Sequence, residues 1–338
     1  MAEKYLDSRR VLSIDVLRGF VMFMIIGGAD VFRVVFNSLG MSFLASQLEH
    51  ASWNGVTFWD TIFPMFIFIM GVVIPFSRAL EGERKSVYFH ILERTLVLIF
   101  LGLVVNGVLN RNFSELRYMS VLGRIGFCYF FSSIIFLHTK MKGQIFVLVS
   151  ILIGYWVMMT QIPGFDLTPS GNLAGYVDKM FLPGVLLREY GDAEGLLSTL
   201  PAIATSLFGL LSGEILKTNH LSKNRRLIVI LSIGVFSILF GLLWSVVFPL
   251  NKFLWTSSYV LFTGGLNLVL LSILYGLIDI VRFNKWAFPF IIVGMNSILI
   301  YMLTGLNVFN FVKNTYLQLI IKLLFMYYLY RKKIIFTI

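Results

Sequence analysis

Residues 56–77 read VTFWDTIFPMFIFIMGVVIPFS, an apolar run in which Asp60 is the only charged side chain. As an α-helix, which rises about 1.5 Å per residue, a run of this length crosses the roughly 30 Å of hydrocarbon in a membrane. Similar apolar runs recur near 12–32, 91–109, 120–138, 144–160, 196–216, 227–248, 257–281, 287–309 and 316–330. This pattern predicts an all-α fold: a polytopic integral membrane helix bundle with about ten transmembrane helices.

The composition agrees with a membrane bundle. Of the 338 residues, 58% are hydrophobic and 13% are charged. An ordinary soluble domain carries roughly 25% charged residues, and so few charges cannot cover a surface that faces water. The single cysteine, Cys128, lies inside an apolar run, so an intrachain disulfide is excluded.

The distribution of charge predicts the topology. The net charge is +11, and with the N-terminus placed inside, 17 of the 28 lysines and arginines fall in inner connections and tails, whereas 7 fall in outer segments. The inner group includes Lys4, Arg9 and Arg10. This asymmetry follows the positive-inside rule and predicts that both termini are cytoplasmic. Because the inner cations are scattered over separate loops and do not form one basic face, nucleic acid is excluded as a partner.

The chain is organised as one transmembrane domain over residues 1–338, with two long outer segments at 33–55 and 161–195. Most other connections are short, as expected of antiparallel neighbouring helices. The second outer segment is acidic, which would favour a cationic acceptor such as an amine, although a solvated loop is the commoner explanation. Gly209 and Gly213, four residues apart in one apolar run, predict a close-packing helix face.

One histidine stands apart from the others. His50 lies on the predicted outer side, in HASWNG, directly before the span that holds Asp60. The bend at Asn54-Gly55 would let the Asp60 carboxylate reach back to the imidazole, which would fix its tautomer and strengthen the other ring nitrogen as a base or nucleophile. An outer-loop histidine is more often structural than catalytic, so position alone leaves both interpretations open. The remaining histidines lie in or beside inner connections: His90, His138 and His220.

Charged side chains within membrane spans need a partner or a wet cavity. Asp15 and Arg18 are three residues apart on one helix face and can pair with each other. Asp60 and Arg124 both lie about one turn in from the outer surface, a depth that His50 could reach by folding inward. His50, Asp60 and Arg124 therefore outline one polar site toward the outer face, with structural salt bridging as the competing explanation for each residue alone.

Further polar residues mark the walls of this site: Asn106, Asn110, Asn251, Lys252, Trp255, Asn296 and Ser297. Amides at membrane depth must be satisfied, so they face other helices, their default role, or a ligand. The sequence contains no zinc-ligand set, no phosphate-binding glycine loop and no nucleophile-elbow motif. No metal is therefore expected.

The chain resembles the transmembrane acyltransferase family of heparan-α-glucosaminide N-acetyltransferase in two strings, RVLSIDVLRGF at 10–20 and HASWNGVTFWDTIFPMFIFIMG at 50–71. The likeness continues through VLGRIG at 121–126, EGLLSTLPAI at 194–203, PLNKFLWTSSYV at 249–260 and GMNSI at 294–298. It thus covers nearly the whole chain. The HASWNG segment with its downstream aspartate is the specific signal, whereas DVLRG also occurs in other membrane acyltransferases.

The resemblance implies an acyltransferase domain that acetylates the amine of glucosamine, or of a glucosamine-terminated saccharide, on the periplasmic side. It places the family's active-site histidine on His50 and the aspartate that follows on Asp60. The family's asparagine near the outer end of the first span falls near Ala29 and Asp30, a departure in which Asp30 is the candidate substitute. Lysosomal members also carry a luminal domain and an extra helix ahead of this region, and their absence here suggests a bacterial inner (cytoplasmic) membrane protein that spans the membrane many times.

The resemblance also implies acetyl-CoA as the co-substrate. Its nucleotide is expected to stay near inner cations while the pantetheine arm threads inward to bring the thioester to His50. His50 then either deprotonates the sugar ammonium for direct attack or first accepts the acetyl group itself. Arg124 or a nearby amide would stabilise the oxyanion that forms. The expected acetyl-CoA contacts are Arg18, Arg94, Arg124, Asn251, Lys252, Trp255, Ser258 and Asn296.

Other expected partners are the amino-sugar substrate and membrane lipid, and a second copy of the chain in a homodimer is kept open. Two rival functions are also kept. One is an O-acyltransferase of a cell-envelope glycan, which would acetylate a hydroxyl. The other is a sugar or peptide transporter without chemistry, against which the absence of an evident inverted repeat counts mildly.

Overall fold

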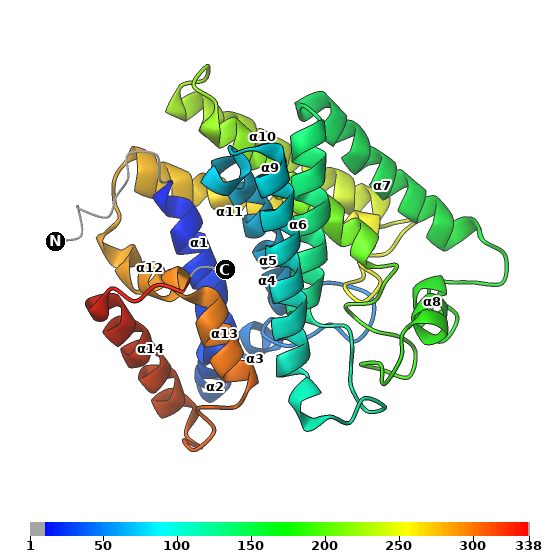
Figure 1. Cartoon of the computed structure of the whole chain (residues 1–338), viewed down its shortest axis with the longest axis horizontal. Helices are drawn as coiled ribbons and strands as arrows, with labels where there is room; N and C mark the ends of the chain where they lie inside the picture. The colour runs from blue at the N-terminus through cyan, green and yellow to red at the C-terminus, as the bar shows by residue number, and fades with distance from the viewer. Residues whose placement is uncertain (1–10, 337–338) are drawn as a thin grey trace.

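The computed structural model describes residues 11–336, so Lys4, Arg9 and Arg10 lie outside the described residues. Within that range the chain is helical, and its only strand-like pairings are isolated bridges in connections. Figure 1 shows the helices gathered into one bundle. Eight segments are long and apolar enough to cross a membrane: Leu12–Ser38 (α1 Leu12–Phe23 and α2 Ala29–Ser38), Phe58–Phe76 (with α4 Phe58–Val73), α5 Arg84–Val105, α6 Val121–His138, α7 Met141–Gln161, α9 Thr199–Lys217, α10 Lys223–Trp244 and Ser257–Ile280 (with α11 Ser257–Leu274).

The all-helical prediction is confirmed for the described residues, and the last two expected spans differ from simple helices. The run at 287–309 is a broken pair, in which Lys285–Met295 and Ser297–Gly305 meet at 63°. Its halves contain α12 (Phe288–Met295) and α13 (Ser297–Gly305). The run at 316–330 forms α14 (Thr315–Lys332), which carries three cations. By length and composition, residues 11–336 thus hold eight spans, or nine if the bent pair counts as one.

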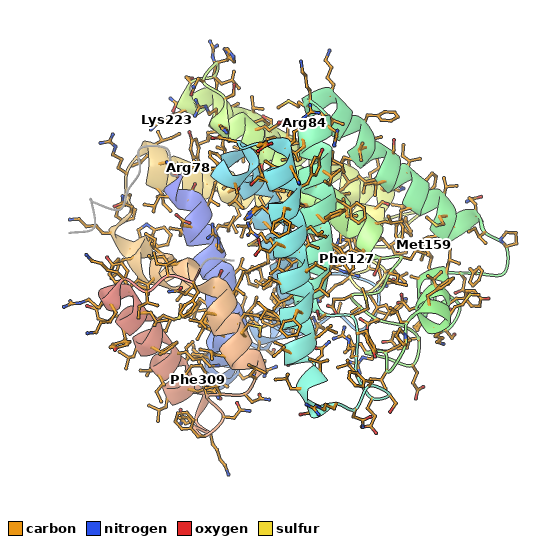
Figure 2. The ribbon with its side chains drawn as sticks, viewed as in Figure 1. Arg78, Arg84, Phe127, Met159, Lys223 and Phe309 are labelled. Atoms are coloured by element: carbon orange, nitrogen blue, oxygen red, sulfur yellow. The ribbon has the colours of Figure 1, made fainter. Side chains whose placement is uncertain are left out.

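The expected outer segments contain short helices of their own. The segment 33–55 includes the end of α2 and helix α3 (Ser42–Ser46), and the segment 161–195 contains α8 (Leu173–Phe181). Figure 2 places Arg78, Arg84 and Lys223 at one end of the bundle, the end from which α1 starts, and Phe309 at the other. All three cations belong to the group assigned to the inner side. This clustering supports the expected topology, and the cytoplasmic placement of both termini stays a prediction.

Helix α9 lies at the centre of the bundle, where it packs against α4, α6, α7 and α11. Most of its apolar window is buried (78%), as is most of that of α4 (72%), whereas only 22% of α10 is buried. Helices α4 and α9 therefore lie in the core of the bundle, and α10 lies at its periphery.

The contact between α4 and α9 depends on glycines. A Cβ atom on Gly209 would lie 2.0 Å from the carbonyl oxygen of Phe68, and one on Gly213 would lie 2.3 Å from that of Val72. On the facing helix, a Cβ on Gly71 would lie 2.0 Å from the carbonyl oxygen of Ser206. The two backbones approach closely because no side chain stands between them, which confirms the packing face expected at Gly209 and Gly213.

Replacing Gly209 with alanine is therefore expected to destabilise the protein by about 1–3 kcal/mol, because the added methyl group forces α4 and α9 apart. The matched control is Gly154→Ala in α7, where a Cβ would meet nothing within 4 Å. In the control, alanine should leave stability unchanged or raise it slightly through its higher helix propensity. Thermal unfolding of both detergent-purified variants measures the difference, and equal midpoints would contradict the close approach.

The first span is interrupted near its middle. Residues Met24–Gly28 form a π-helical turn in which Gly27 has a φ of 134°, a value that favours glycine. The irregular turn leaves the carbonyl oxygen of Ile26 free for an outside donor, and Nζ of Lys322 donates to it at 2.8 Å. This contact explains how α14 buries a lysine at membrane depth.

Candidate active site

The site begins with the turn that precedes α4. Thr57 caps this helix, and the Asp60 carboxylate reaches back to it. Oδ2 of Asp60 accepts hydrogen bonds from the backbone N–H of Ala51 (3.1 Å), the backbone N–H of Thr57 (3.2 Å) and the hydroxyl of Thr57 (3.0 Å). The HASWNG segment is thereby folded over the start of the helix. One carboxylate oxygen is fully used by these contacts, and only Oδ1 is left for other partners.

His50 takes up that remaining oxygen. Its Nδ1 lies 2.7 Å from Oδ1 of Asp60, so the contact predicted from the sequence is present. The Asp60 side chain is 2% exposed and the His50 side chain is 57% exposed. Because a buried carboxylate with its other oxygen saturated can only accept, Nδ1 must carry a proton, and in the neutral ring the lone pair is on Nε2.

Lys252 is the third member of the site. Its Nζ lies 3.1 Å from Nδ1 of His50 and 3.4 Å from Oδ1 of Asp60, and its side chain is 23% exposed. It follows Asn251 in the connection between α10 and α11. Burial lowers the pKa of Lys252, and the charge of Asp60 opposes this shift by stabilising the ammonium form.

One side-chain hydrogen bond and one backbone hydrogen bond join the HASWNG segment to the PLNK segment. The amide of Asn251 donates to Oδ1 of Asn54 at 3.1 Å, and the N–H of Gly55 donates to the carbonyl oxygen of Leu250 at 2.8 Å. Gly55 has a φ of 102°, which favours glycine at this turn. These links hold His50 and Lys252 side by side at Oδ1 of Asp60.

A layer of buried residues lies beneath the site. The hydroxyl of Tyr259 donates to the carbonyl oxygen of Asp60 at 2.6 Å, which ties the start of α4 to α11. Trp255 is buried, with its Nε1 donating to the hydroxyl of Thr205 at 3.0 Å and its ring edge-on to Phe63 at 5.3 Å. The site is therefore supported by packed aromatic side chains from α4 and from the residues that enter α11.

Arg124 lies on this supporting layer and not in the site itself. Its guanidinium is fully buried, 5.0 Å from the ring centre of Trp255, and donates to the carbonyl oxygen of Gly195 and the hydroxyl of Ser198. Its Nε and Nη1 have no hydrogen-bond partner within residues 11–336. No hydrogen bond or ion pair among these residues joins Arg124 to His50 or Asp60.

The acidic outer segment has a structural role that the sequence did not suggest. Asp192 and Glu194 are buried and both pair with Arg117 from the α5–α6 connection. Burial alone would lower the pKa of Arg117, but these two carboxylates outweigh it and raise that pKa. Asp178 accepts hydrogen bonds from the backbone N–H groups of Asp192 and Leu196, and burial raises its pKa. These three acids therefore stabilise the fold of the outer segment through internal ion pairs and hydrogen bonds. They form neither a free acidic lid nor a solvent-exposed acidic loop.

Asp30, the third expected catalytic residue, makes no hydrogen bond or ion pair with His50 or Asp60 within residues 11–336. Asp30 is exposed in α2 and pairs with Arg33 at 3.1 Å. Arg33 also lies 3.8 Å from Glu49, the residue before His50. Asp30 is therefore linked to the site indirectly, through Arg33 and Glu49.

The remaining expected acetyl-CoA contacts are spread through the bundle. Arg18 pairs with Asp15 at 3.3 Å in α1, as expected, and Arg94 covers the ring of Tyr129 at 4.5 Å. Ser258 donates to the carbonyl oxygen of Phe248. The amide of Asn296, at the break between α12 and α13, binds the backbone of Ile334 at 3.0 Å and of Phe336 at 2.8 Å. The structure does not bring these four side chains together.

Thr57 and Tyr259 also hold Asp60 in place, and neither is among the residues predicted from the sequence. Thr57 stands three residues before Asp60, and this spacing is a capping pattern that could have identified it. Tyr259 is 199 residues from its partner, and no local pattern indicates that contact. Within residues 11–336, no group of three or more His, Cys, Asp or Glu side chains could hold a metal ion.

The bundle of apolar helices indicates a polytopic membrane protein. The exposed imidazole of His50, which contacts the buried Asp60 carboxylate, is its candidate base or nucleophile. No protein-family model matches the chain. Heparan-alpha-glucosaminide N-acetyltransferase of Homo sapiens is 26% identical over 364 residues, which cover 87% of this chain and 52% of that protein. The protein of the same name from Mus musculus is 27% identical over 325 residues, covering 75% of this chain and 48% of that protein.

The chain is therefore homologous to these acetyltransferases, and similarity over most of its length supports its membership of their family. This confirms the resemblance inferred from the motifs. The chain spans about half the length of the curated relatives it matches.

Proposed function

We propose that this protein transfers an acetyl group from cytoplasmic acetyl-CoA to the amine of glucosamine, or of a glucosamine-terminated saccharide, on the periplasmic side of a bacterial inner membrane. The observation that carries the proposal is the state of His50. Its Nδ1 is held by the buried carboxylate of Asp60 at 2.7 Å, and in the neutral ring the lone pair is on Nε2. The names of the two relatives supply the reaction type.

The chemistry requires one base at the point of transfer. An amino sugar near neutral pH is an ammonium ion, which must lose a proton before its nitrogen can attack a thioester. Nε2 of His50 can remove that proton, after which a C–N bond forms, the C–S bond breaks and coenzyme A leaves as the thiol. In the two-step alternative, Nε2 attacks the thioester first and the amine then takes the acetyl group from the ring.

A route for the donor is supported by buried polar atoms that lack partners. They include the hydroxyls of Ser132 and Ser133 on α6 and of Ser206 on α9, both amide atoms of Asn267 on α11, and two nitrogens of Arg124. Helices α6 and α11, which carry the other groups, both pack against α9. A polar group at membrane depth needs a partner. The amide and carbonyl groups of a pantetheine arm are partners of the right kind, and so the residues present fit acetyl-CoA.

The test is product analysis with the purified full chain. Acetyl-CoA and a panel of amino sugars are supplied, thiol release is followed, and products are identified by mass spectrometry. We expect coenzyme A release that depends on the acceptor, together with an N-acetylated sugar. Transfer to N-acetylglucosamine as readily as to glucosamine would instead indicate O-acylation. Uptake of glucosamine by proteoliposomes without consumption of acetyl-CoA would overturn the proposal in favour of a transporter.

A further inference from the structure

A histidine–aspartate pair does not require a lysine. The ammonium of Lys252 nevertheless lies within hydrogen-bond distance of the His50 imidazole. The distance from Nζ to Nδ1 of His50 is 3.1 Å. Because Nδ1 is 2.7 Å from a carboxylate oxygen, the space between those two atoms is occupied by the Nδ1 proton, and Nδ1 has no lone pair to offer. Lys252 therefore cannot donate to the ring. Its proton points to Oδ1 of Asp60, 3.4 Å away, and its charge stands beside the imidazole.

The positive charge of Lys252 opposes one effect of Asp60 on His50, which is stabilisation of the imidazolium ion. A carboxylate in contact with a histidine stabilises the imidazolium ion, and an imidazolium has no lone pair at Nε2 with which to accept a proton or an acetyl group. A positive charge 3.1 Å from the same ring destabilises the imidazolium. The side chains of Asp60 (2% exposed) and Lys252 (23% exposed) are both poorly screened by water, so both charges act on the ring.

The other charges near the ring are exposed. Glu49 precedes His50, and Arg33 of α2 lies 3.8 Å from the Glu49 carboxylate and 3.1 Å from that of Asp30. These three side chains are 40–59% exposed, so water screens their charges at the ring. The ring of Trp59, which also lies beside the imidazole, is uncharged. The balance at His50 is therefore set by Asp60 from α4 and by Lys252 from the α10–α11 connection.

The position of Lys252 is built into the fold. Asn251 uses its side-chain oxygen to accept from the N–H of Leu254 at 2.8 Å and its side-chain nitrogen to donate to Asn54 at 3.1 Å. Asn54 belongs to the same HASWNG segment that carries His50. The lysine and the histidine are thus fixed to each other through their neighbours, independently of their own contact.

We propose that Lys252 is a positioning residue, which keeps His50 neutral so that Nε2 stays available while Asp60 fixes the tautomer. The contribution of Lys252 to acetyl transfer rests on the proposed function. Its effect on the protonation of the imidazole does not. Asp60 then determines which nitrogen carries the proton, and Lys252 keeps the ring from taking a second one.

The test reads the protonation of His50 directly. Diethyl pyrocarbonate acylates neutral imidazole, and the extent of modification of each histidine is measured by mass spectrometry of the full chain between about pH 5 and pH 9. In Lys252→Met, the midpoint for His50 should move up by about one pH unit, because the ring then meets the carboxylate alone. In Lys252→Arg, which keeps the charge, the midpoint should stay near that of the wild type. His90, His138 and His220 are controls within the same protein and should not move.

An unchanged midpoint in Lys252→Met, with the other histidines also unchanged, would overturn the proposal and leave Lys252 as a tether between two loops. A tether would reduce activity equally at every pH, whereas the proposed role also moves the acid limb of the pH–rate profile upward in Lys252→Met. The modification reports on His50 whether or not acetyl transfer is found. A shifted midpoint in a protein that releases no coenzyme A would therefore refute the proposed function while sustaining the role of Lys252.

Discussion

His50→Ala is expected to lower the rate of acetyl transfer by about 10³-fold or more and to leave the fold intact. The loss follows from removing the proposed base or nucleophile at the point of transfer, a contribution of about 10²–10⁴-fold for a general base and larger for a group that also forms a covalent intermediate. The fold should survive because the side chain is 57% exposed, and Asp60 keeps its contacts with Ala51, Thr57 and Lys252.

The measurement is the initial rate of coenzyme A release with glucosamine as acceptor, accompanied by the thermal unfolding midpoint. His220→Ala is the matched control, because His220 lies in the loop before α10 at the opposite end of the bundle from the predicted outer site. It should show wild-type turnover. A His50→Ala protein that turns over at the wild-type rate would refute the assignment of His50, whatever its stability.

The helical framework could be predicted because each span is an unbroken apolar run bounded by charges or turns. The runs 120–138 and 257–281 correspond closely to Val121–His138 and Ser257–Ile280. The break at Asn296 could not be predicted, since both halves of that run are equally apolar. Its amide binds the backbone of Ile334 and Phe336, about forty residues away, and such a contact leaves no mark on local hydropathy.

The same limit applies to the site. His50 and Asp60 are ten residues apart and flank a turn, so their contact could be predicted from spacing. Lys252 is 202 residues from His50, and the motif that contains it suggested contact with acetyl-CoA, whereas the structure places its ammonium on the imidazole. The sequence predicts Arg124 in the site, whereas the structure places its guanidinium over the Trp255 ring, because depth along a helix does not determine which neighbour the side chain faces.

The structure also gives the acidic outer segment a different role from the one that its charges suggest. Counted as charges along the chain, its acids suggest a lid that attracts amines. In the structure, Arg117 pairs with both Asp192 and Glu194, and Asp178 is buried. Under the proposed function, these buried acids are therefore not available to attract a cationic acceptor.

Asp60→Asn should cost nearly as much as the loss of His50, about 10³–10⁴-fold in turnover, because it reverses the tautomer of the ring. Three donors converge on Oδ2 of Asp60: the N–H groups of Ala51 and Thr57 and the Thr57 hydroxyl. An asparagine must turn its carbonyl oxygen toward these donors, which leaves its NH₂ group facing Nδ1 of His50. Nδ1 must then accept, the proton moves to Nε2, and the lone pair needed for chemistry is lost.

The substitution also leaves the Lys252 ammonium facing an NH₂ group where it now meets a carboxylate, so Lys252 will tend to turn away. Turnover and thermal unfolding are measured together, with Asp166→Asn as the control, since Asp166 is an exposed aspartate that accepts from Thr168 in its own outer turn. We expect the control to keep wild-type turnover. Because the change from carboxylate to amide preserves shape, a folded Asp60→Asn protein that retains turnover within about tenfold of the wild type would show that the tautomer of His50 does not govern the reaction.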